Sequence, residues 1–296
     1  MAISMLAAAY LFFGGAGAGL LFFACLLEEW SVRRDSPSLL HRGDGMPFRQ
    51  RCFGLALGLF SVGLICLVFD LGRPQNALII FLHPAWTFLS VGAYLLATCV
   101  VLTSVLLIRG WFFPKMTYGP LCSVMRILAL PCALAVMVYT GLLLNDLQPV
   151  PLWGSQWIPA LFLASSLAAG AACMVLCSSL PDEGHRRRAP LERRYALVDL
   201  GLALAETLFA AAFVSSLLHG ALSAQSLDSL FEWGAGQALF CGGFLVCGIA
   251  IPLAGDVLVL IRRSGAYATW LVALFCLIGC FCLRLAMATA GIHIGV

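Results

Sequence analysis

Long apolar runs separated by short polar connections are the main pattern of this chain. Eight of these runs are each long enough to cross a bilayer, because a span needs about 20 mostly apolar residues for a hydrocarbon core about 30 Å thick. In lipid each run must be helical, since no water is present to satisfy exposed backbone groups. We therefore predict eight transmembrane helices, over residues 4–27, 53–70, 86–108, 121–143, 158–178, 197–218, 237–260 and 268–290.

The connections between the runs are too short to hold a soluble domain. The longest cover residues 28–52 and 179–195, well below the size that supports a core of its own. Hydrophobic residues make up 62% of the sequence and charged residues 10%, which excludes a soluble globular protein. The first run lacks a basic segment before it and has no obvious cleavage site, so we expect a retained helix rather than a signal peptide. The predicted fold is all-α, with residues 1–296 forming one polytopic membrane domain, and any soluble catalytic machinery must belong to another protein.

The arginines predict how the helices cross the membrane. Four alternate connections, which must share one side, hold fourteen of the 17 Lys and Arg residues, whereas the other connections hold only Arg73. Basic residues near span ends favour the cytoplasmic side. We therefore expect a multi-pass protein of the cytoplasmic membrane with both termini on the outer, periplasmic side. The Arg186–Arg188 run is then a topology signal and does not indicate binding of nucleic acid.

Histidine and cysteine positions argue against bound metal. A membrane-embedded haem needs histidines that project from within the spans, but all five histidines lie in connections or at span ends. The 13 cysteines fall within or beside spans without a Cys-x-x-Cys pair, and the outer connections lack the cysteine set that ligates an iron–sulfur cluster. We expect no haem, no iron–sulfur cluster and no metal site in this protein.

A set of polar and aromatic residues gathers on the expected outer side. Asp70 and Arg73 follow the second span, His83 and Trp86 precede the third, and Tyr139 lies near the end of the fourth. Polar groups at membrane depth are costly and are usually paired or functional. The simpler alternative for Asp70 and Arg73 is a local ion pair at a helix end.

Three carboxylates lie within the later spans. Glu206 is near the middle of the membrane, and Asp199, on the same helical face, lies about 10 Å away along the axis. Asp256 lies in the inner part of the seventh span. Such residues often mark proton routes, so all three are proton-route candidates. The alternative is structural, an interhelical pairing of Glu206 with Arg126 or Arg284.

Several motifs in order resemble the NrfD-like, polysulfide-reductase-type membrane subunits. The first span resembles the opening helix of that family, and the Asp-Leu-Gly-Arg-Pro motif resembles its most recognisable signature. The likeness continues through the fourth and fifth spans to the last helix. The residues that carry it are 10–19, 70–74, 139–143, 151–153, 159–165, 283–285 and 290–291.

The resemblance implies a function. Members of the family are haem-free anchors that bind quinone near the outer face and exchange electrons with a docked iron–sulfur subunit, often alongside a molybdenum catalytic subunit. Tyr139 matches a family tyrosine that lies near the quinone, and this quinone is either menaquinone or ubiquinone. Asp70, Arg73, His83 and Trp86 join Tyr139 as quinone-binding candidates. The protein would thus be the quinone-reactive subunit of a multi-subunit oxidoreductase in anaerobic respiration rather than an enzyme alone.

Two other functions stay open. Ile3, Ser4 and Met5 stand where some members carry Asn or His, which permits a passive anchor without quinone chemistry. A secondary transporter could also have eight helices and an intramembrane carboxylate, although we detect no inverted repeat. The sequence does not identify the terminal substrate, the direction of electron flow or the oligomeric state.

Overall fold

The computed structural model describes residues 5–33, 48–70, 88–113, 119–146, 151–178, 189–218, 235–262 and 266–290. All regular structure in these residues is helical, and eight helices are long and apolar enough to cross a membrane, which confirms the predicted fold class. The elements are α1 (Met5–Arg33), α2 (Phe48–Asp70), α4 (Phe88–Phe112), α5 (Pro120–Asp146), η3 (Pro151–Gly154), α6 (Ile158–Ser178), α7 (Ala189–Leu218), α9 (Ala235–Gln237), η5 (Ala238–Ala250), α10 (Ile251–Arg262) and α11 (Ala266–Ala290).

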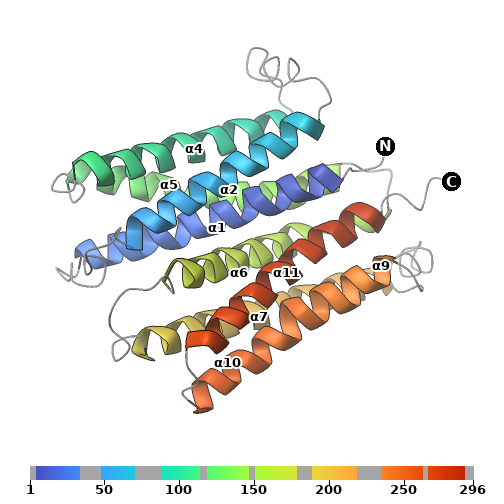
Figure 1. Ribbon diagram of the computed structural model, residues 1–296. Coiled ribbons are helices and arrows are strands. Elements are labelled where there is room, and N and C mark those ends of the chain that lie inside the picture. Colours follow the sequence, from blue (N-terminus) through green and yellow to red (C-terminus); the bar gives the residue numbers. More distant parts are fainter. Residues whose placement is uncertain are drawn as a thin grey trace.

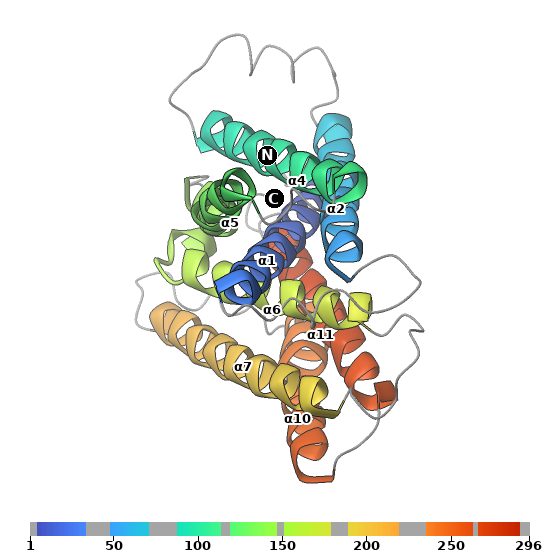
Figure 2. The ribbon, with the colours of Figure 1, turned by 90° about the vertical axis from the view of Figure 1, so that its left-hand side faces the viewer.

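The helices form two groups that meet along α1 and α6. Helices α2, α4 and α5 lie on one side of this pair, and α7, α10 and α11 lie on the other (Figures 1 and 2). Among the eight spans, α1 and α6 bury the largest share of their residues. Large apolar side chains such as Ile65, Val101 and Leu208 remain exposed on the outer helices. An exposed apolar surface of this kind suits contact with lipid chains.

Close contact between α1 and α6 depends on two glycines. A Cβ on Gly19 would overlap the backbone carbonyl of Ser166, and a Cβ on Gly170 would overlap the backbone of Gly19. Small residues at helix crossings in membranes let backbones approach, and packing then replaces the hydrophobic effect as the source of stability. The glycine-rich stretch of α1 is therefore a packing surface.

The seventh span combines α9, η5 and α10 in one rod, of which η5 is π-helical. The Ile251 N–H donates to the Val246 carbonyl, five residues back, and Pro252 follows without an N–H of its own. A missing donor disturbs the regular ladder and favours wider turns. The rod lies against α11 where Gly248 faces Gly279 so closely that a Cβ on either would meet the other backbone. Gly255, the residue before Asp256 on α10, likewise lies against Val272 of α11.

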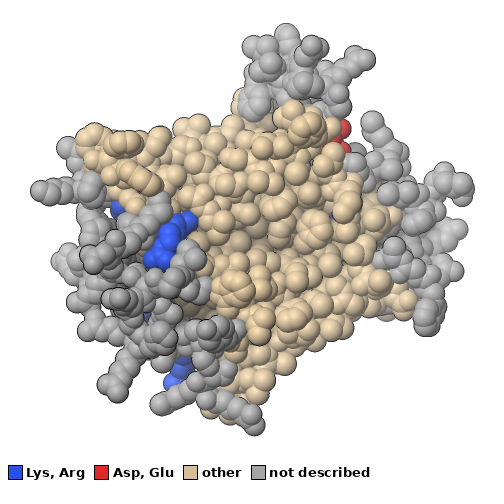
Figure 3. Space-filling model, in the orientation of Figure 1, with Lys and Arg blue, Asp and Glu red and all other residues tan. Residues whose placement is uncertain are grey.

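Basic residues gather at one end of the bundle. This arginine-rich end is where α1 and α4 end and where α2 and α7 begin, with Arg49, Arg51, Arg109 and Arg193. Figure 3 shows the blue side chains at this end, while uncharged residues form the middle of the visible face. Helix α1 begins and α11 ends at the opposite end (Figure 1).

Candidate functional site

Two tyrosines meet in the interior near the end opposite the arginines. The hydroxyl oxygens of Tyr10 on α1 and Tyr139 on α5 are 3.0 Å apart, and each residue is only 4% exposed. Tyr10 lies five residues after the start of α1, and Tyr139 lies seven residues before the end of α5. Gly92 on α4 makes room for the Tyr139 ring, since a Cβ there would overlap the ring atoms. Three helices thus fix this hydroxyl pair.

The pair has spare hydrogen-bonding capacity. A phenol carries one O–H donor and can also accept, so a bond between two phenols uses only one of the two O–H groups. The second O–H can donate to a carbonyl oxygen of a bound molecule. Sites for small molecules are usually apolar pockets in which a few fixed polar groups orient the ligand.

Arg284 on α11 contacts α1 at Leu11, the residue after Tyr10. Its guanidinium donates to the hydroxyls of Ser165 and Ser166, both at 2.8 Å, and to the Cys280 carbonyl at 2.9 Å. Its Nε donates to the carbonyl of Leu11, the residue after Tyr10, at 3.3 Å. The rings of Phe12 and Phe162 complete the surroundings, with centroids 5.9 and 5.2 Å from the Arg284 Cζ.

Glu206 on α7 approaches Arg284 from the other side. Its carboxylate accepts a hydrogen bond from the Ser165 hydroxyl, the same hydroxyl that accepts from Arg284. Its Oε1 has no hydrogen-bond partner among the described residues, and the side chain is buried. Of the two cations that the sequence suggested for Glu206, Arg284 is therefore the neighbour, joined to it through Ser165. Arg126 is not.

Asp199 and Asp256 face each other nearer the arginine-rich end than Glu206, since Asp199 lies seven residues, or about 10 Å, before Glu206 on α7. Their carboxyl groups are close enough to share a hydrogen bond, and both line a small cavity between α6, α7, α10 and α11. The three carboxylates named from the sequence therefore divide into a single buried group, Glu206, and a facing pair.

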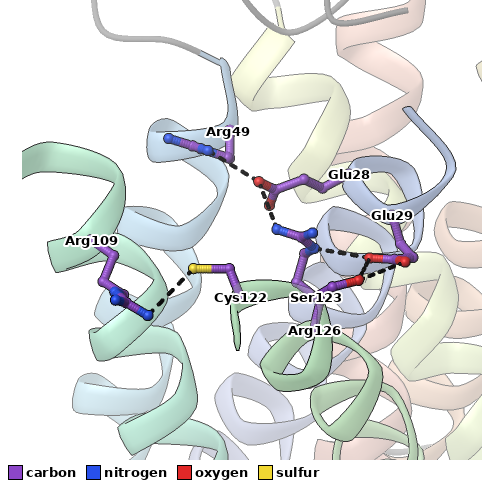
Figure 4. A network of polar contacts seen from close by, with 7 residues as sticks. All are labelled: Glu28, Glu29, Arg49, Arg109, Cys122, Ser123 and Arg126. Atoms are coloured by element: carbon purple, nitrogen blue, oxygen red, sulfur yellow. Dashed lines mark hydrogen bonds and ion pairs between the residues drawn. The ribbon is translucent and has the colours of Figure 1, made fainter. Parts of the chain in front are cut away.

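A second charged cluster lies at the arginine-rich end and joins α1, α2 and α5 (Figure 4). Arg126 donates to Glu29 at 3.2 Å and to Glu28 at 3.4 Å, and Arg49 donates to Glu28 at 3.0 Å. The Ser123 hydroxyl contacts both oxygens of the Glu29 carboxylate at 2.8 Å. The expectation that residues 28–52 form a connection was wrong at both ends, because α1 continues to Arg33 and α2 begins at Phe48. The suggested pairing of Arg126 with Glu206 was also wrong, because Arg126 binds the two glutamates near the end of α1 instead.

Of the other outer candidates, the structure describes only Asp70, which is not part of the tyrosine pair. Asp70 is the last residue of α2, and its side chain is exposed. Arg73, His83 and Trp86 lie outside the described residues. Of the five quinone-binding candidates from the sequence, the structure therefore places only Tyr139 in a buried polar arrangement.

Sequence reasoning overlooked Tyr10 as a site residue and treated it as part of a packing helix. A hydroxyl-bearing ring in an otherwise apolar segment, five residues from the helix start, was the available signal. The partner could not be identified from it, because Tyr10 and Tyr139 are 129 residues apart.

Comparison with known proteins gives one family. The model of the family described as "Polysulphide reductase, NrfD" matches residues 3–295. The protein is 27% identical to one of the chains of polysulfide reductase from Wolinella succinogenes, over 96% of its own length and 92% of that relative. It is also 27% identical to the protein NrfD homolog of Haemophilus influenzae over 78% of each sequence, and 26% identical to protein NrfD of Escherichia coli over 58% of each.

Proposed function

The protein belongs to the NrfD polysulphide-reductase family, and we propose that it serves as the haem-free, quinone-reactive membrane subunit of a respiratory oxidoreductase complex. Membership of a family of membrane subunits fits the eight apolar helices and the absence of any large connection in the sequence. The quinone site, the partner subunits and the membrane orientation are the parts that we infer from the site geometry and the charge pattern.

The observation that carries the proposal is the buried Tyr10–Tyr139 pair. A quinone presents two carbonyl oxygens on a flat apolar ring, and its conversion to quinol moves two electrons and two protons. The second O–H of the tyrosine pair, for which the described residues offer no acceptor, suits one carbonyl, and donation from a fixed phenol orients the ring and stabilises negative charge on that oxygen. The Arg284 guanidinium on α11, which contacts the backbone of Leu11 next to Tyr10, adds a fixed positive charge near the first turns of α1.

The position of the proposed site suggests a route by which electrons reach the quinone. The tyrosine pair lies near the end of the bundle where α1 begins and α5 ends. A docked iron–sulfur subunit on that face would bring a cluster close to the quinone without a metal in this protein. The Wolinella relative is named as one chain of a polysulfide reductase, which suggests an assembly of several chains, and we extend this to an iron–sulfur and a molybdenum subunit here.

Orientation follows from the basic residues. The arginine-rich end would face the cytoplasm, which puts the tyrosine pair and both termini on the outer side of the cytoplasmic membrane. Protons for the quinone could then come from outside or, across the membrane, along Asp256, Asp199 and Glu206. Only the second route would contribute to charge separation.

Substitution of either tyrosine with phenylalanine tests the quinone site. Tyr139→Phe keeps the ring against Gly92 and removes one hydroxyl, so the fold should survive. Loss of one hydrogen bond costs about 0.5–1.5 kcal/mol, which corresponds to a loss of binding of roughly 2–10-fold. We expect quinol-linked turnover of the assembled complex to fall in Tyr139→Phe and in Tyr10→Phe. Electron transfer from a soluble dye straight to the partner subunits should stay at the wild-type rate.

The matched control is Tyr94→Phe, which removes a phenol hydroxyl from the same helix as Gly92 but at a more exposed position. It should leave quinol-linked turnover unchanged. Wild-type quinol-linked turnover in Tyr10→Phe and Tyr139→Phe alike would show that the protein is a passive anchor or that quinone binds elsewhere.

A further inference from the structure

The small cavity between α6, α7, α10 and α11 contains more polar groups than its neighbours satisfy. Asp199 and Tyr195 line it from α7, Asp256 from α10 and Thr269 from α11, while alanines and valines form the rest of the wall. The Thr269 hydroxyl, the Tyr195 hydroxyl and Oδ2 of Asp256 have no hydrogen-bond partner among the described residues. Thr269 is 6% exposed and Asp256 is 1% exposed. Buried polar groups are almost always paired, so these three atoms indicate an occupant.

The cavity is small and has room for only one water molecule or one small ion. Its volume is about 10 Å³, close to what one water molecule or one small ion requires. The available ligands are carboxyl and hydroxyl oxygens, the atoms that hold hard cations. Two carboxyl groups and two hydroxyl groups from three different helices therefore line a space that fits one water molecule or one small ion.

Charge balance determines what that particle must be. None of the cavity-lining residues that the structure describes is Lys, Arg or His. The titratable groups around the pair are Tyr195 and Glu206 on α7 and Cys276 and Cys280 on α11, none of which supplies a positive charge. The Arg284 guanidinium interacts with Glu206 and Cys280, and among the described residues no cation interacts directly with Asp199 or Asp256. Two ionised carboxylates this close, away from bulk water, would repel each other and lose their hydration. A positive charge must therefore accompany them.

We propose that this cavity is a binding site for one small monovalent cation, either a proton held between the carboxyls with a bound water or a sodium ion, in exchange with the arginine-rich side. Tyr195 and Asp199 keep part of their surface accessible, whereas Asp256 and Thr269 are enclosed. Tyr195 is six residues into α7 and Asp256 six residues before the end of α10, which places both about 9 Å from the helix ends. This proposal deepens the proton-route part of the proposed function.

Cation titration of the purified full-length protein in lipid nanodiscs tests the site without any quinone. The thermal unfolding midpoint is measured as NaCl replaces choline chloride at constant ionic strength, at several pH values. If Na⁺ is the occupant, the midpoint rises saturably with NaCl, and the half-saturating concentration increases as the pH falls, because protons compete. If the proton is the occupant, NaCl has no specific effect, and infrared difference spectra between two pH values show a carboxyl band that disappears in Asp256→Asn.

Thr269→Val keeps the shape of the side chain and removes one ligand oxygen. In the sodium case the half-saturating concentration should rise roughly 2–10-fold, and in the proton case the carboxyl band should shift. Thr103→Val is the control, because this buried hydroxyl on α4 donates to the Cys99 carbonyl of its own helix and lies apart from the cavity. It should change neither readout.

A midpoint independent of NaCl together with no titrating carboxyl band would overturn the proposal. So would either signal persisting unchanged in both Asp256→Asn and Thr269→Val. Thr269→Val keeps the test decisive where Asp256→Asn fails to fold. Since no readout involves quinone, a failure here is distinct from a failure of the tyrosine site.

Discussion

Arg126→Met is expected to lower the free energy of unfolding by about 3–5 kcal/mol, the largest effect of any single substitution that we predict. Arg126 is 0% exposed and binds both Glu28 and Glu29, so its loss removes an ion pair from each of two buried carboxylates and leaves Glu28 with Arg49. Breaking a buried ion pair by removing one member is far more costly than replacing the whole pair. Unfolding in mixed micelles, followed by circular dichroism as a denaturing detergent is added, measures the change.

Two further variants separate charge from packing. Arg109→Met removes an arginine that contacts the Cys122 thiol in the same region (Figure 4), and it should cost much less. Adding Glu29→Gln to Arg126→Met neutralises the carboxylate that has lost its ion pair with Arg126, while Glu28 keeps its ion pair with Arg49, and should restore part of the lost stability. A double variant no more stable than Arg126→Met alone would mean that shape, and not charge, makes Arg126 important.

Gly19→Ala is expected to destabilise the protein by about 1–3 kcal/mol, the usual cost of overpacking a closely fitted contact. The new methyl group would overlap the Ser166 carbonyl, a backbone atom that cannot rotate away, so α1 and α6 must separate. The Ser166 hydroxyl also binds Arg284, so the shift should disturb the contacts of Arg284 as well.

Gly14→Ala, in the same helix, provides the control. A Cβ at Gly14 meets no atom within 4 Å, and alanine favours a helix over glycine by about 1 kcal/mol. The two substitutions should therefore change stability in opposite directions in the same detergent titration. Equal effects at both positions would show that α1 and α6 do not pack as described.

The helices could be predicted from the sequence because a backbone in lipid must satisfy its own hydrogen bonds. An apolar run of span length must be helical, and all eight predicted runs are. The ends were less predictable. Glu28 and Glu29 indicated the end of the first span by their charge, yet the helix continues to Arg33 because Arg49 and Arg126 neutralise them. Interhelical pairing of this kind depends on which helices are neighbours, which hydropathy does not reveal.

The same reason limits prediction of the site. Tyr139 was identifiable through a motif, but its contact with Tyr10 requires α1 to lie beside α5. Asp199 and Asp256 were separately visible as intramembrane carboxylates, but only the packing of α7 against α10 makes them a facing pair. Residue type indicated where chemistry is possible, and tertiary packing decided which groups act together.

Photoaffinity labelling of the purified complex with an azido-substituted quinone tests the central claim most directly. The tyrosine pair predicts labelled peptides from the first turns of α1 around Tyr10, from α4 around Gly92 and from α5 around Tyr139. Excess unlabelled quinone should abolish this labelling, and Tyr139→Phe should weaken it. Labelling confined to α7, α10 and α11, or labelling that excess quinone does not displace, would contradict a quinone site at Tyr10 and Tyr139.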